Sequence, residues 1–273
     1  MFYNDAQQAA IKKLLDTIQV STYHPSKYET NVVSGHTYPV IDKTKKPTYT
    51  VYGGNTLSEE FRSEKKANIE AFERARIIQK FPQYFIDNYC KISHPMHGQI
   101  PFKTYDYQKD ILKDFNDYRF NVILKARQLG ISTISAAYVA WFMLFHREKN
   151  VLVIATKLST ATNLVKKVKM IFKNLPSFML IAKISIDNKQ SFELSNGSQV
   201  KAGTTSGDAG RSEALSLLII DEAAFVDGLE ELWTGLYPTL STGGRCIALS
   251  TPNGVGNWFH KAYTEAETGT NDF

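Results

Sequence analysis

The sequence predicts an α/β protein whose central sheet is mainly parallel. From about residue 103, short apolar runs alternate with segments of helical periodicity. The apolar runs are nearly continuous, which is typical of strands buried on both faces. A glycine-containing loop, "KARQLGIS" at 125–132, also stands between one such run and the helical segment that follows it. Together these patterns indicate strands that are separated by helices and covered by them on both sides.

The core elements are predicted in order from these runs. Four strands are expected, over 121–125, 151–156, 215–223 and 245–254. Three helices are expected, over 132–147, 158–174 and 229–239. A hairpin at 191–203 contains Asn196-Gly197 as a two-residue turn. Ligands of such sheets bind beyond the carboxyl ends of the strands, where every candidate residue below is found.

The chain is predicted to have two parts, an N-terminal region over 1–100 and the α/β core over 101–273. The first part is expected to be helical and irregular. It contains an amphipathic helix over 5–19, a polar, turn-rich stretch over about 20–60, and a charged helix over 58–80. The polar stretch is expected to wrap the surface or to order only against a partner.

Composition restricts the classes of protein that remain. Of the 273 residues, 43% are hydrophobic and 22% are charged, as in a globular protein. Two cysteines, Cys90 and Cys246, form no disulfide framework, which indicates a reducing, intracellular setting. No secretory leader and no apolar run long enough to span a membrane is apparent, so no membrane partner is expected. The net charge of +5 permits contact with nucleic acid without arguing for it.

The loop at 125–132 follows the phosphate-binding pattern G-x-x-x-x-G-K-[ST] only in part. Gly130 and Ser132 match the second glycine and the serine, but Ile131 replaces the lysine and Lys125 the first glycine. Its position between a strand and a helix still allows backbone amides to cradle phosphate oxygens. Lys125 or Arg127 is expected to supply the missing charge. The expected nucleotide-binding residues are Lys125, Ala126, Arg127, Gln128, Leu129, Gly130, Ile131, Ser132 and Thr133.

An acidic pair ends the apolar run "LLIIDE". Asp221 and Glu222 are expected to emerge at the tip of a buried strand. There, Asp221 together with Ser132 suits Mg²⁺, and Glu222 is placed to orient and deprotonate an attacking water. Acids at this position can instead mark the start of a helix. Beside the loop, however, the pair favours nucleotide hydrolysis.

Three further motifs complete the candidate site. In "YDYQKDIL", Tyr107 is expected to stack on a base and Gln108 to read an adenine edge. In "STPNG", Ser250 and Thr251 are expected to sense the terminal phosphate and couple its loss to movement. In the glycine-rich "TTSGDAGRSEA", Arg211 is expected to act as a finger in a neighbouring subunit's site.

With these motifs in this order, the chain resembles the large terminase subunit of tailed bacteriophages, the motor that packages DNA into capsids. The resemblance covers residues 75–265 and rests on "YDYQKDIL", "KARQLGIST", "LLIIDEAAF" and "STPNG". It implies a RecA-like P-loop ATPase fold and a basic residue early in the loop, as Lys125 is. It also implies that Lys125 and Arg127 contact the phosphates, that Ser132 and Asp221 hold Mg²⁺, and that Glu222 activates the attacking water. By the same resemblance, Gln108 reads the adenine, Thr251 couples hydrolysis to movement, and Arg211 acts in the site of a neighbouring subunit.

The resemblance further implies the reaction and its partners. ATP and Mg²⁺ are the expected cofactors. Double-stranded DNA, a portal protein and a small terminase subunit are the expected partners. The protein is expected to form a homo-oligomeric ring at the procapsid, in the host cell cytoplasm. The family's ribonuclease-H-type nuclease domain has no counterpart in 255–273, so ATP hydrolysis without DNA cleavage is expected.

Two other classes share part of this pattern. A helicase-like ATPase also has the phosphate loop, the Asp-Glu pair and the glutamine, but a helicase needs a second RecA-like lobe. A nucleotide-binding scaffold would explain the missing lysine at Ile131. The Asp221–Glu222 pair argues against the scaffold, because binding alone does not require a base.

Overall fold

A computed structural model describes residues 30–33, 36–39, 77–94, 96–204 and 214–273 of the chain. The chain divides into two units, Met1–Ala75 and Arg76–Phe273. The helix expected over 5–19, most of the helix expected over 58–80, and Arg211 lie outside the described residues. The predicted division near residue 100 stays a prediction.

The first unit contains a pair of short strands. Strand β1 (Thr30–Val33) pairs antiparallel with β2 (His36–Pro39), and Thr30 lies opposite Pro39. The β-branched residues of β1 favour an extended backbone. The sequence predicted only an irregular polar stretch here, and this pair departs from that prediction.

A seven-stranded sheet forms the centre of the second unit. Its order is β5-β11-β10-β6-β9-β8-β7. The strands are β5 (Phe120–Leu124), β6 (Asn150–Ala155), β7 (Ile184–Asp187), β8 (Ser191–Leu194), β9 (Gln199–Gly203), β10 (Leu217–Asp221) and β11 (Arg245–Ser250). Strands β5, β11, β10, β6 and β9 run parallel, and β8 and β7 are antiparallel to their neighbours. This arrangement confirms the mainly parallel sheet that the sequence predicted.

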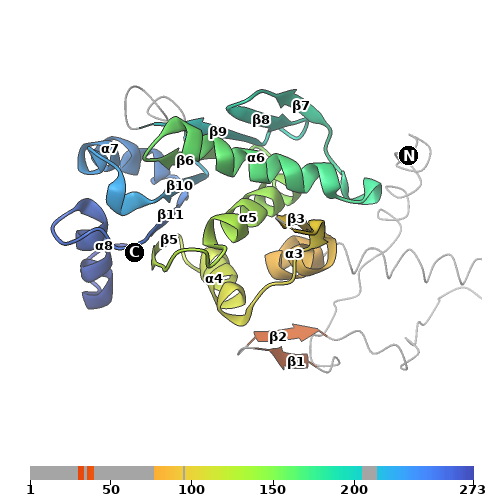
Figure 1. The fold of residues 1–273 in the computed structure, drawn as a ribbon, viewed down its shortest axis with the longest axis horizontal. Helices are drawn as coiled ribbons and strands as arrows, with labels where there is room; N and C mark the ends of the chain where they lie inside the picture. The colour runs from red at the N-terminus through yellow and green to blue at the C-terminus, as the bar shows by residue number, and fades with distance from the viewer. Residues whose placement is uncertain (1–29, 34–35, 40–76, 95, 205–213) are drawn as a thin grey trace, which may run out of the picture. The chain divides into compact units, whose positions relative to one another are not determined.

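Helices cover both faces of this sheet (Figure 1). One face carries α3 (Pro82–Tyr89), α4 (Asp106–Asp117), α5 (Ile131–Phe145) and α6 (Leu158–Asn174). The other face carries α7 (Leu229–Leu236) and α8 (Trp258–Thr268). The remaining elements are the β3 (Lys91–His94) and β4 (Gly98–Pro101) hairpin and the 3-10 turns η2 (Ser177–Met179), η3 (Ala223–Phe225) and η4 (Tyr237–Leu240).

Strand β10 shows why the strands appear in the sequence as continuous apolar runs. All five of its residues are buried. Leu217 and Ile219 join the hydrophobic cluster beneath α5 and α6, whereas Leu218 and Ile220 join the cluster beneath α7. Successive side chains of a strand point to opposite faces, so a strand covered on both sides has no polar face.

Two predicted boundaries are wrong for local reasons. The helix predicted over 229–239 ends at Leu236 and continues as η4, because Pro238 lacks the N–H that an α-helix needs at that position. The hairpin loop has three residues, Ser195–Gly197, instead of two. The Gly197 N–H donates to the Leu194 carbonyl at 3.0 Å, and Gly197 takes a left-handed φ of +80°. A turn that is closed by one left-handed residue gives a loop of this length.

Within the described ranges, no helix is both long and apolar enough to cross a membrane.

Candidate nucleotide-binding site

The candidate site lies where three parallel strands end. The loop after β5 leads into α5, and the Lys125 N–H donates to the Ser250 carbonyl at 2.9 Å. In the strand pairing, Leu124 lies opposite Ser250, and Leu249 lies opposite Asp221. The register of the sheet therefore brings the loop, the acidic pair and the "STPNG" segment to one edge.

The loop backbone is shaped by two left-handed residues, Gln128 at φ +64° and Gly130 at φ +70°. Gly130 is the N-cap of α5, and its carbonyl accepts from the N–H groups of Thr133 and Ile134, each at 2.9 Å. The free N–H groups of the first turn and the helix dipole favour an anion here. The Ile131 side chain is 2% exposed and belongs to the hydrophobic core, so it faces away from any bound phosphate.

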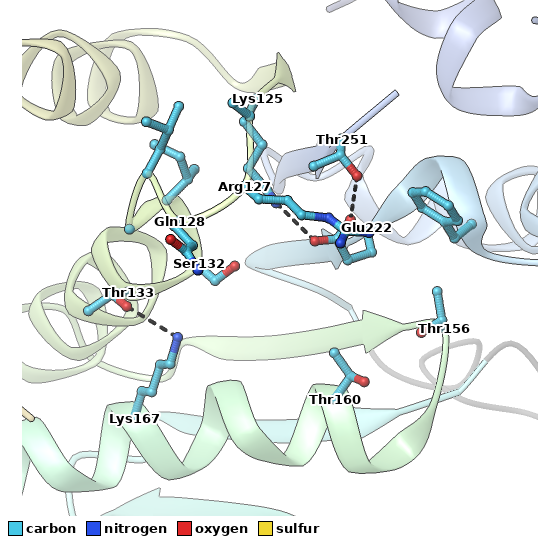
Figure 2. Close-up of a pocket in the computed structure, with 15 residues that line it drawn as sticks. Lys125, Arg127, Gln128, Ser132, Thr133, Thr156, Thr160, Lys167, Glu222 and Thr251 are labelled. Atoms are coloured by element: carbon cyan, nitrogen blue, oxygen red, sulfur yellow. Dashed lines mark hydrogen bonds and ion pairs between the residues drawn. The ribbon is translucent and has the colours of Figure 1, made fainter. Parts of the chain in front are cut away.

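A pocket of about 610 Å³ opens above the loop. Figure 2 shows side chains around it from α5, from α6 and from the segments that follow β5, β6, β10 and β11. This volume is within the usual range for small-molecule sites. The pocket is lined by the loop residues 125–133 and by Thr156, Thr160, Lys167, Glu222, Phe225 and Thr251.

The carboxylate of Glu222 has two partners in this pocket. The Lys125 ammonium lies 2.9 Å from Glu222 Oε1 in an ion pair. The Thr251 hydroxyl donates to Glu222 Oε2 at 3.3 Å (Figure 2). Glu222 itself has a left-handed φ of +54°, which is uncommon for a residue with a Cβ. Such strain persists where the surrounding structure fixes the side chain, and it is often found at functional sites.

Asp221 lies deeper, at the end of β10. It is 5% exposed, and its Oδ1 accepts from the Ser132 hydroxyl at 3.2 Å and from the Glu222 N–H at 3.0 Å. Burial raises the pKa of Asp221 above its usual value, and the Ser132 hydrogen bond and the nearby Lys125 charge oppose that rise. A hydroxyl and a carboxylate oxygen thus stand together, and both are ligands that Mg²⁺ accepts.

Tyr107 and Gln108 contact the backbone of the loop. The Tyr107 hydroxyl and the Gln108 amide both donate to the Leu129 carbonyl, at 2.9 and 3.0 Å. Gln108 is 2% exposed, and its Oε1 accepts from the Tyr105 N–H at 3.2 Å. The pair therefore holds the loop in place. The expected contact of these residues with adenine stays a prediction.

Ser250 and Thr251 connect the acidic segment to β11. The buried Ser250 hydroxyl accepts from the Ala224 N–H at 3.1 Å and donates to the Thr251 carbonyl at 2.8 Å. The Asn253 amide donates to the Ala224 carbonyl at 2.9 Å. A change at Glu222 thus has a direct route to the "STPNG" segment through Thr251, although the coupling role stays a prediction.

Most of the predicted site residues come together. The nine loop residues, Glu222 and Thr251 line the pocket, and Asp221 contacts Ser132 at its base. Tyr107 and Gln108 lie behind the loop, and Ser250 lies beneath the pocket.

Sequence reasoning missed the α6 side of the pocket. Thr156 directly follows β6, Thr160 lies in the first turn of α6, and Lys167 lies in its third turn. Lys167 directly precedes the buried Val168 and follows the buried Leu164 by three residues, so it borders the apolar face. That border position is the one signal in the sequence that separates it from the exposed Lys166.

The fold and this site define a class of protein. A parallel sheet with a phosphate loop after its edge strand, and an acidic pair two strands away, is a RecA-like P-loop domain. Residues 122–270, more than half of the chain, match the family described as "Terminase large subunit, T4likevirus-type, N-terminal". The chain therefore belongs to the large terminase subunit family.

Two solved structures are similar to the chain in fold. The large terminase ATPase domain of Thermus phage P74-26 has a TM-score of 0.52 at 18% identity, and the match covers 59% of this chain and 69% of that one. The large terminase of bacteriophage HK97 has a TM-score of 0.55 at 15% identity, and the match covers 70% of this chain and 42% of that one. The chain thus spans less than half the length of the HK97 protein.

Proposed function

We propose that this chain is an ATPase motor domain of a large terminase subunit, which hydrolyses ATP to translocate double-stranded DNA into a procapsid. The observation that carries the proposal is the contact of Glu222 with both Lys125 and Thr251 at the edge of the phosphate-loop pocket. These contacts join a phosphate-binding cation, a candidate base and a coupling segment in one place.

The geometry supports a sequence of roles in hydrolysis. The amides of the loop and of the α5 start bind the ATP phosphates. The Lys125 ammonium, which lies 2.9 Å from Glu222, also attracts them. When the phosphates draw Lys125 toward themselves, the Glu222 carboxylate is released to accept a proton from the attacking water. Thr251, whose hydroxyl donates to the other Glu222 oxygen, then responds to this change in the contacts of Glu222.

A magnesium ion fits the donors at the base of this pocket. Ser132 and Asp221 would hold Mg²⁺ together with the ATP phosphates, where the ion would neutralise phosphate charge. The described residues contain no group of three or more His, Cys, Asp or Glu side chains that would hold a metal without ATP. This donor set therefore fits a metal that arrives with the nucleotide.

Membership of the terminase family supports the proposed partners. They are double-stranded DNA, a portal protein and a small terminase subunit, and the chain would act as a homo-oligomeric ring. The reaction would take place at the procapsid, in the host cell cytoplasm. The proposal includes the action of Arg211 in the active site of a neighbouring subunit.

The test is ATP turnover by the wild type and by Glu222→Gln. Loss of a general base lowers turnover by about 10²–10⁴-fold. Binding of ATP should persist, because glutamine keeps the shape of the side chain. Glu231→Gln is the matched control, since Glu231 is exposed on α7 and is not one of the pocket residues. Unchanged turnover in Glu222→Gln would exclude Glu222 as the base, and no turnover in the wild type with DNA present would favour a scaffold.

A further inference from the structure

The ammonium group of Lys167 is directed at the start of α5. Its Nζ donates to the Thr133 hydroxyl at 3.1 Å, and the side chain lines the same pocket as the loop. Figure 2 shows Lys167 reaching from α6 toward Thr133, on the opposite side of the pocket from Lys125. The two lysines therefore reach the pocket from different segments, Lys167 from α6 and Lys125 from the start of the loop itself.

Half-buried Lys167 differs from Lys169, the buried lysine of α6. Lys169 forms an ion pair with Asp187 at 2.8 Å. Lys167 has no such carboxylate partner among the described residues, and its one hydrogen bond there is to a neutral hydroxyl. Burial lowers the pKa of Lys167, and the nearby Lys125 charge lowers it further, although Asp221 opposes both effects. A desolvated cation that lacks an ion-pair partner is stabilised by an incoming anion.

The loop position that carries the lysine in the usual pattern supplies no charge here. The Ile131 side chain is in the core, and Lys125 is paired with Glu222. We propose that Lys167 shares the role of the missing loop lysine with Lys125 by binding the polyphosphate of the nucleotide from α6. This inference rests on the proposed nucleotide binding, and it adds a phosphate-binding residue outside the loop.

A purely structural role would need only the hydrogen bond between α6 and α5. Lys167→Gln separates the two roles, because glutamine keeps a donor for Thr133 but removes the charge. Lys167→Arg keeps the charge. Lys166→Gln is the matched control, because Lys166 is the neighbouring residue on the same helix and is exposed.

The experiment is equilibrium binding of a fluorescent ATP analogue to the four proteins. Lys167→Gln should bind at least about tenfold more weakly than the wild type, Lys167→Arg should stay within about threefold, and Lys166→Gln should match the wild type. Binding by Lys167→Gln within about twofold of the wild type would overturn the inference. A wild type that binds no nucleotide would instead contradict the proposed function.

A second measurement serves if Lys167→Gln does not fold. In the wild type, ATP should slow acetylation of Lys167 by an amine reagent and leave acetylation of Lys166 unchanged, as followed by mass spectrometry. Equal acetylation of Lys167 with and without ATP, under conditions where ATP is bound, would also overturn the inference.

Discussion

Lys125 and Arg127 stand two residues apart in the phosphate loop, but their surroundings differ. The Lys125 side chain is 9% exposed and is held by Glu222, whereas Arg127 is exposed to solvent. A cation that is already fixed and desolvated interacts with charge more strongly than a solvated one. The structure therefore favours Lys125 as the residue that compensates within the loop for the missing lysine.

Lys125→Ala and Arg127→Ala should accordingly differ in steady-state ATP turnover. Removing Lys125 takes away a positioned charge, and we expect turnover to fall by about 10²-fold or more. Removing Arg127 should lower turnover by less than about tenfold, because a solvated charge contributes little. Unfolding temperatures near that of the wild type would show that both variants fold. Equal loss in the two variants, or a larger loss in Arg127→Ala, would assign the role to Arg127.

Several site residues that the sequence predicted share one property, which is their place at the carboxyl end of an apolar strand. Asp221 and Ser250 are the last residues of β10 and β11, and Lys125 directly follows β5, so the end of a strand fixes where each of them lies. Lys167 does not have it. Its contact with Thr133 depends on how α6 packs beside α5, and helix packing is not encoded in any short stretch of sequence.

Gly130 links the loop to α5, and a substitution there would test how tightly that junction is packed. It has φ +70°, and a Cβ added there would lie 2.9 Å from Gln108 Nε2. Gln108 cannot move freely, because its amide donates to the Leu129 carbonyl and its Oε1 accepts from the Tyr105 N–H. Gly254 has a similar φ of +68°, but nothing lies within 4 Å of its added Cβ.

We expect Gly130→Ala to destabilise the protein more than Gly254→Ala does. Both variants bear the left-handed strain of about 1–2 kcal/mol. Gly130→Ala also disturbs the hydrogen bonds of Gln108, which adds about 1 kcal/mol. Urea unfolding measures the difference in the free energy of unfolding, and ATP binding should weaken in Gly130→Ala alone. Equal unfolding free energies would mean that Gln108 yields without cost and does not brace the loop.

At the scale of elements, the sequence predicts those that have a strong hydrophobic pattern. Strands β6 and β10 and helix α6 match their predicted spans to within a few residues, because a continuous apolar run or a clear amphipathic period dominates each. The misses depend on single residues: Pro238 ends α7 early, and Gly197 lengthens the hairpin loop. The sequence also did not predict which strand of the sheet the hairpin pairs with. Strand β9 pairs with β6, a contact between segments far apart in sequence.

The order of the strands is what assembles the site. Strand β11 lies between β5 and β10, so the residue after Ser250 stands between the loop and the acidic pair. Thr251 contacts Glu222 for this reason, although 28 residues separate the two in the chain. The parallel pairing of β10 with β11 fixes this arrangement.

Mixing two inactive chains tests whether the active sites of the assembly are shared between subunits. If Arg211 acts in trans, each working site needs its own Glu222 and an Arg211 from a neighbouring subunit. Arg211→Ala and Glu222→Gln should each lack ATP turnover when assembled alone, on DNA or on a portal protein. In an equal mixture, half of the sites keep Glu222 and half of those meet an intact Arg211, so turnover should return to about a quarter of the wild-type value.

The mixture is informative only if the two chains assemble together, which cross-linking of differently tagged chains would show. With mixed assemblies present, turnover near a quarter would establish that active sites are shared across subunits, because neither chain supplies both groups to its own site. Continued inactivity would place Arg211 in the same subunit's site. Turnover by Arg211→Ala alone would remove Arg211 from the mechanism. In both of these cases, a single subunit would have to hydrolyse ATP without a residue from its neighbour, and the ring would serve translocation and not catalysis.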